Sequence, residues 1–101
     1  MKQLTSMQEF LTTVHTTPRA IVKFTSNGCA PCRALTPILE QIEQENQIMA
    51  FDVNVDELPD AVEQFEVTCV PTTIVFFGGQ EFARVEGLRP KEDMLKLISQ
   101  F

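Results

Sequence analysis

The sequence contains no tryptophan and no tyrosine, so all eight of its aromatic side chains are phenylalanines. It also lacks a basic stripe: its eight lysines and arginines are scattered singly among 14 acidic residues, and the formal net charge is −6. A nucleic-acid-binding surface requires clustered positive charge, so nucleic acid is excluded as a partner. We interpret the acidic excess as a feature that maintains solubility.

Long apolar runs are missing as well. No stretch approaches the roughly 20 residues that a membrane span requires, and residues 1–6 lack the apolar core of a secretory signal. Three cysteines are few, and odd in number, for a disulfide-stapled secreted domain. We therefore expect a cytoplasmic protein that does not associate with membranes. Its 101 residues suffice for a single domain, 1–101, and are too few for two.

The sequence does contain alternating strand and helix patterns. A capping box at Ser6–Glu9 predicts the start of the first helix, Pro37 should bend the long second helix, and Gly78-Gly79 is typical of a hairpin turn. The order βαβαβαββα predicts an α/β fold, with a mixed sheet covered by helices on both faces. Strands are expected at 2–5, 20–25, 49–56, 72–77 and 81–86, and helices at about 6–15, from the cysteines to about 45, at 58–65 and at 89–101.

Cys29-Ala30-Pro31-Cys32 is the motif that carries chemistry. It lies between an apolar strand and a helix, where free backbone N–H groups and the helix dipole stabilise a thiolate. A Cys-x-x-Cys motif near a βαβ pattern indicates a redox-active disulfide. The alternative is half of a zinc site, but no second Cys-x-x-Cys or nearby histidine supplies the remaining ligands.

The sequence resembles the thioredoxin family along nearly its whole length. The resemblance rests on 22–33 with its two cysteines, on Pro37, on 53–56, on Val70-Pro71-Thr72, on 77–80 and on Gly87. It implies the thioredoxin fold, a central mixed five-stranded sheet flanked by four helices, and activity as a protein-disulfide reductase. It also implies no bound cofactor, electrons from NADPH through a thioredoxin reductase, and a cis proline at Pro71 beside the disulfide.

The sequence departs from the family pattern at five places. Gly28 and Thr25 stand where the family usually has tryptophan, and Ala30 replaces the usual glycine between the cysteines. Lys23 occupies the position of a buried aspartate, and Asp52 that of the neighbouring lysine, so this pair of charges is swapped.

The resemblance and the position at a helix start together assign the catalytic roles. We expect Cys29 to be the exposed nucleophile, Cys32 the buried resolving thiol, and Pro31 a residue that keeps the turn rigid. Two interpretations of the Lys23–Asp52 pair stay open. Asp52 either simply neutralises the charge of Lys23, or the pair relays a proton for Cys32 with Asp52 as general base.

The remaining expectations concern the rim of the site. Gly28, Ala30, Val70 and Gly87 are expected to border the substrate groove. Cys69 is interpreted as a partly exposed, candidate regulatory thiol that could link a dimer, and the alternative is a small buried apolar residue. The protein is otherwise expected to be a monomer.

Two other functions stay open at this stage. A glutaredoxin-like enzyme would use glutathione, although no basic or tyrosine-bearing pocket for it is evident in the sequence. A non-catalytic binding module of the same fold is the second alternative, but it has no need of two intact cysteines.

Overall fold

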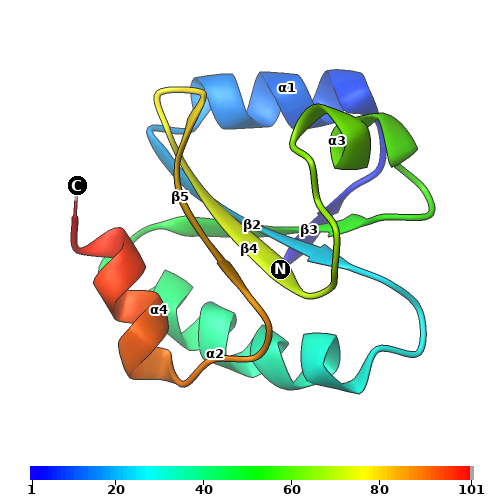
Figure 1. Cartoon of the computed structure of the whole chain (residues 1–101). Coiled ribbons are helices and arrows are strands. Elements are labelled where there is room, and N and C mark those ends of the chain that lie inside the picture. Colours follow the sequence, from blue (N-terminus) through cyan, green and yellow to red (C-terminus); the bar gives the residue numbers. More distant parts are fainter. Residues whose placement is uncertain (101) are drawn as a thin grey trace.

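The computed structural model describes residues 1–100. Strands and helices alternate over these residues in the predicted order (Figure 1). The elements are β1 (Lys2–Leu4), α1 (Met7–Thr16), β2 (Arg19–Thr25), α2 (Ala30–Asn46), β3 (Met49–Asn54), α3 (Pro59–Gln64), β4 (Thr72–Phe77), β5 (Gln80–Glu86) and α4 (Lys91–Ile98).

The five strands form one mixed sheet in the order β1-β3-β2-β4-β5. Strands β1, β3 and β2 are parallel, whereas β4 is antiparallel to both β2 and β5. Helical crossovers join the parallel strands, as the alternating pattern predicts. The predicted α/β architecture is therefore confirmed, with β2 at the centre of the sheet.

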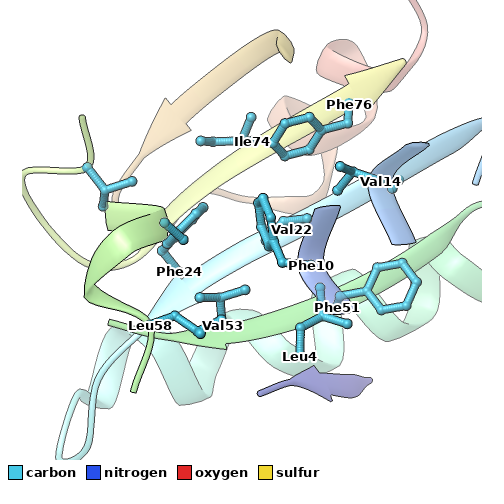
Figure 2. Packing of buried hydrophobic residues seen from close by; sticks show 13 residues of the cluster. Leu4, Phe10, Val14, Val22, Phe24, Phe51, Val53, Leu58, Ile74 and Phe76 are labelled. Carbon is cyan, nitrogen blue, oxygen red and sulfur yellow. The ribbon is translucent and has the colours of Figure 1, made fainter. Parts of the chain in front are cut away.

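One face of the sheet is covered by α1 and α3 (Figure 1). Phe10 of α1 lies in the middle of this core (Figure 2), with its ring centroid 6.3 Å from that of Phe24, 5.5 Å from Phe65 and 5.9 Å from Phe76. Aromatic side chains bury large apolar areas, and phenylalanines alone supply the aromatic part of this core.

The opposite face is covered by α2 and α4 (Figure 1). Leu35 and Leu39 of α2 and Met94 of α4 pack there against Ile21 and Val75 of the sheet. Because side chains alternate along a strand, Val22 and Phe24 belong to the other core, while Lys23 shares the face of Ile21. Strand β2 thus directs one buried ammonium group toward α2.

Two elements have a boundary that lies two residues or more inside the predicted one. The strand expected at 49–56 ends at Asn54, because the Asn54 side chain accepts the N–H of Asp56 at 2.9 Å and turns the chain. The helix expected at 89–101 begins only at Lys91 and ends at Ile98, since a residue before proline, here Arg89, disfavours helical backbone. Phe101, which we expected to face inward, lies outside the described residues.

The capping box at α1 is confirmed only in part. The Ser6 hydroxyl accepts the N–H of Glu9 at 3.1 Å, as predicted. The Glu9 carboxylate, however, accepts the N–H of Thr5 at 2.8 Å rather than that of Ser6. The reciprocal bond is thus displaced by one residue toward the N-terminus.

Candidate active site

Cys29 and Cys32 form a disulfide at the beginning of α2, with their Cα atoms 5.3 Å apart. Cys29 is the N-cap residue of this helix, and its Sγ accepts the N–H of Cys32 at 3.2 Å. Pro31 stands in the first turn, where its missing N–H costs no helical hydrogen bond. A thiolate at Cys29 would therefore meet both a backbone donor and the positive end of the helix dipole.

The two sulfur-bearing residues differ in exposure. Cys32 is 1% exposed and belongs to the buried face of α2, whereas Cys29 is partly exposed. Gly28, Ala30 and Pro31 around it are exposed. A substrate can therefore approach the disulfide from the side of Cys29.

Lys23 lies directly beneath this turn. Its side chain is 3% exposed, and its Nζ donates to the backbone oxygen of Cys32 at 2.8 Å and to the hydroxyl of Thr36. The same Nζ is 3.2 Å from Oδ1 of Asp52, whose side chain is 22% exposed. The charge-swapped pair predicted from the sequence is thus an ion pair tied to the backbone of Cys32.

Strand register explains why these groups meet. Lys23 on β2 is paired directly with Asp52 on β3 and with Thr73 on β4, so the three residues form a row across the sheet beneath α2. Asp52 Oδ1 and the Thr73 hydroxyl make no hydrogen bond with the described residues. The contact between Lys23 and Asp52 is therefore coulombic rather than a hydrogen bond.

Thr36 is a site residue that the sequence analysis missed. Its hydroxyl accepts from Lys23 and donates to the oxygen of Cys32 at 3.4 Å. It immediately precedes Pro37, which cannot donate to the carbonyl one turn earlier. Its position directly before that proline was the only feature of the sequence that could have pointed to it.

The Val70–Pro71 peptide bond is cis, as the resemblance implied. The Pro71 oxygen accepts the N–H of Gly87 at 2.8 Å, which holds Gly87, a residue expected to border the groove, against the cis proline. Val70 is partly buried beside them.

An apolar pocket of about 250 Å³ extends from Val70. Cys69 lines it and is exposed, so the expected exposure is confirmed and the buried alternative is wrong. Its polar contacts in the described chain are with Thr72, whose hydroxyl donates to the Cys69 oxygen at 2.7 Å. Ser26 and the valines at 55, 62 and 67 complete most of the wall.

A second cavity, of about 340 Å³, shares the lining residue Ser26 with the apolar pocket. Thr25, Ser26 and Gly28 of the segment before Cys29 line it, together with Arg33 of α2 and Asp52 and Asn54 of β3. Gly28 therefore borders this polar cavity rather than the apolar pocket. Its backbone has φ +73°, a conformation that favours glycine over a residue with a side chain.

Within residues 1–100, no group of three or more histidine, cysteine or acidic side chains is arranged to hold a metal ion. No helix in the same range is both long and apolar enough to cross a membrane.

Comparison with known proteins assigns the family. The family model described as Thioredoxin matches residues 2–100. A thioredoxin of Chlamydia caviae is 40% identical over 79% of this chain and 79% of its own length, and one of Chlamydia trachomatis is 34% identical over 99% and 98%. A bifunctional thioredoxin reductase/thioredoxin of Mycobacterium leprae is 32% identical over 96% of this chain, which corresponds to 22% of that protein.

Solved structures agree with this assignment. Oxidised mitochondrial thioredoxin 3 of Saccharomyces cerevisiae superposes with a TM-score of 0.91 at 25% identity, covering 100% of this chain and 95% of that one. A mutant thioredoxin of Halobacterium salinarum superposes with a TM-score of 0.93, covering 99% and 88%, and at 22% identity it shows the shared thioredoxin fold. The chain therefore belongs to the thioredoxin family and is a thiol–disulfide oxidoreductase.

Proposed function

We propose that Cys29 performs the first step of protein-disulfide reduction and Cys32 the second. The Cys29 thiolate attacks one sulfur of the substrate disulfide, forms a mixed disulfide and releases the other substrate sulfur as a thiolate. The Cys32 thiolate then attacks Cys29 Sγ, which closes the Cys29–Cys32 disulfide and releases the second substrate thiolate. Two electrons pass from the protein dithiol to the substrate.

The contrast in exposure between the two cysteines supports this order, because only the partly exposed sulfur can meet a large substrate first. A Cys32→Ser variant should accumulate a covalent complex with a disulfide-containing protein such as insulin, since the resolving thiol is gone. A Cys29→Ser variant serves as the matched control and should trap none. Trapping by Cys29→Ser instead, visible on non-reducing gels, would reverse the assigned roles.

The oxidised protein must be reduced again, and we propose a thioredoxin reductase that takes electrons from NADPH, with no cofactor bound to this chain. The fusion of the two activities in the Mycobacterium leprae relative supports this partner. A cytoplasmic location fits the same scheme, because the cytosol keeps thiols reduced. NADPH consumption during insulin reduction tests it, with glutathione and glutathione reductase as the comparison. Turnover with glutathione alone would favour the glutaredoxin-like alternative, and no turnover with either would favour a binding module.

We propose that the substrate backbone docks along Val70, Pro71 and Gly87, and that Ala30 completes the rim beside the disulfide. The hydrogen bond between Gly87 and Pro71, and the partial exposure of Val70, support this location. The single domain, 1–101, acts as a monomer in this scheme.

We further propose that Asp52 accepts the proton of the Cys32 thiol, directly or through water, while Lys23 holds the carboxylate in place. The ion pair and the link from Lys23 to Cys32 support this assignment. Asp52→Asn should slow release of the mixed disulfide, measured by single-turnover kinetics across pH, without slowing its formation at Cys29. Unchanged release at every pH would leave the pair with a purely structural role.

Cys69 is proposed as a regulatory thiol, because it is exposed and forms no disulfide with the described residues. Peroxide treatment should produce a disulfide-linked dimer on non-reducing gels. Cys69→Ser should abolish this dimer, and its persistence would assign the dimer to the active-site cysteines.

A further inference from the structure

The polar cavity beside Gly28 has no role in the scheme above. Its volume of about 340 Å³ falls in the range of sites that hold small molecules or side chains, roughly 300 to 1,000 Å³. Gly28, which lines it, is bonded directly to Cys29, and Arg33 lies one helical turn beyond, with its N–H donating to the Cys29 oxygen at 3.2 Å. A chain attached to Cys29 by a mixed disulfide would thus place a neighbouring residue at this cavity.

The charges on the wall give the cavity a positive character. Arg33 and Asp52 are the charged residues that line it. Asp52 is offset by Lys23 at 3.2 Å, and the Met1 ammonium also interacts with it electrostatically. Within residues 1–100, by contrast, no hydrogen bond or ion pair engages the Arg33 guanidinium, which is exposed. Although the net charge of the molecule is −6, the Arg33 guanidinium is therefore a positive group beside Cys29 that can bind a substrate.

The neutral part of the wall is suited to hydrogen bonding. Gln3 and Thr25 line the cavity, and Asn54 holds Asn27 through an amide hydrogen bond of 3.1 Å. Thr25 and Gly28 are small, and both are positions where the sequence departs from a large aromatic residue. Both departures therefore fall on the wall of the same cavity.

We propose that this cavity receives an acidic side chain of the substrate, close in sequence to the cysteine that Cys29 attacks, and that Arg33 determines this specificity. The inference rests on the proposed attack by Cys29. An Arg guanidinium binds a carboxylate through paired charge-assisted hydrogen bonds. Because the molecule as a whole is acidic, it does not attract acidic substrates in general. Only an acidic side chain that reaches the cavity meets the attraction of Arg33.

Symmetric disulfide-linked peptide dimers test the proposal, because attack on either sulfur gives the same product. The peptides carry Glu, Gln or Lys two positions from the cysteine, on its N-terminal side in one series and on its C-terminal side in another. Each peptide also carries one tryptophan, whose fluorescence reports the reaction without background because the protein has neither tryptophan nor tyrosine. The reduced protein is mixed with each peptide, and the second-order rate constant is measured.

In at least one series, the Glu peptide should react about fivefold faster than the Gln peptide and the Lys peptide slowest, as expected for a partly exposed charge pair. Arg33→Gln should remove this order, Arg33→Glu should reverse it, and Thr25→Trp should weaken it by filling the cavity. The order should also shrink in 1 M salt, where the Debye length is about 3 Å.

Lys96→Gln is the matched control, because it removes one positive charge from α4, away from the cavity. It should leave the order intact. Equal rates for all peptides in both series, or loss of the order in Lys96→Gln to the same extent as in Arg33→Gln, would overturn the proposal. Failure of the proposed function is distinguishable, because then no peptide is reduced at all.

Discussion

At the scale of single residues, Lys23 is the one whose burial requires the most compensation. Removing an ammonium group from water costs several kcal/mol unless charge and hydrogen bonds replace the solvent. Cys32 and Thr36 accept two of its hydrogen bonds, and Asp52 balances its charge. The same contacts tie the backbone of the resolving cysteine to the central strand.

Replacing Lys23 should therefore cost stability in a way that depends on Asp52. We expect Lys23→Met to lower the free energy of unfolding by about 2 kcal/mol, because it leaves a carboxylate unpaired. The loss is smaller than for a fully buried pair, since the Asp52 side chain is 22% exposed and borders a cavity. Urea unfolding of the single and double variants measures the coupling.

Adding Asp52→Asn to Lys23→Met should recover part of the loss, because the uncompensated charge is then gone. If the two substitutions were simply additive, the ion pair would contribute nothing beyond the separate side chains.

Gly79 offers a second test at this scale. Its φ is +84°, and a Cβ built there would clash with Nδ1 of His15. For Gly78 beside it, with φ +61°, no described residue beyond its chain neighbours lies within 4 Å of such an atom. Gly78→Ala should cost about 1 kcal/mol from backbone conformation alone, and Gly79→Ala should cost more. Thermal unfolding of Gly79→Ala with and without His15→Ala separates the two causes. A Gly79→Ala cost equal to that of Gly78→Ala would mean that the exposed His15 ring simply moves aside.

At the scale of elements, the N-terminus of α1 links a local contact to pH. The N–H of Thr5 holds the pKa of the Glu9 carboxyl below its usual value. A lowered pKa in the folded state means that this contact stabilises the fold above the unfolded-state pKa and is lost as pH falls through the folded-state pKa. The wild type should therefore be more stable than Glu9→Gln at neutral pH, and the two should converge in acid.

Unfolding titrations from pH 7 downward check this convergence. Ser6→Ala is the comparison, since it removes the cap from the same helix without removing a titrating group. It should cost about 1 kcal/mol at every pH. A constant gap between wild type and Glu9→Gln down to strong acid would contradict the assignment.

The same helix shows what sequence patterns can and cannot give. The Ser6 cap and the element order follow from local preferences, and both were predicted. Whether Glu9 reaches Ser6 or Thr5 depends on a carboxylate rotamer that no spacing rule fixes. Lys23 and Asp52 were paired only through the resemblance, whereas Thr36 and the polar cavity depend on strand register and on the placement of α2 above the sheet.

At the scale of the whole molecule, the redox centre lies apart from the structures that carry most of the stability. One core surrounds Phe10 beneath α1 and α3, and the other packs α2 and α4 against the sheet. Cys32 is buried, but neither core requires a bond between it and Cys29. The fold can therefore pass between the dithiol and disulfide states without being rebuilt.

Reduction should for this reason change global stability only modestly. A disulfide stabilises mainly by restricting the unfolded chain, and the bond between Cys29 and Cys32 closes a very short loop, for which the chain-entropy relation gives about 2 kcal/mol. Urea unfolding of the oxidised and the fully reduced protein measures the difference, with a Cys29→Ala/Cys32→Ala variant, insensitive to reductant, as the control.

A loss of stability much larger than about 2 kcal/mol on reduction would mean that the disulfide supports one of the two cores. A reduced protein as stable as the oxidised one would mean that contacts of the free thiolate, among them the N–H of Cys32, replace what the lost bond contributed. Because the energy of the disulfide relative to the dithiol sets the reduction potential, the same measurement determines how strongly the fold itself favours oxidation.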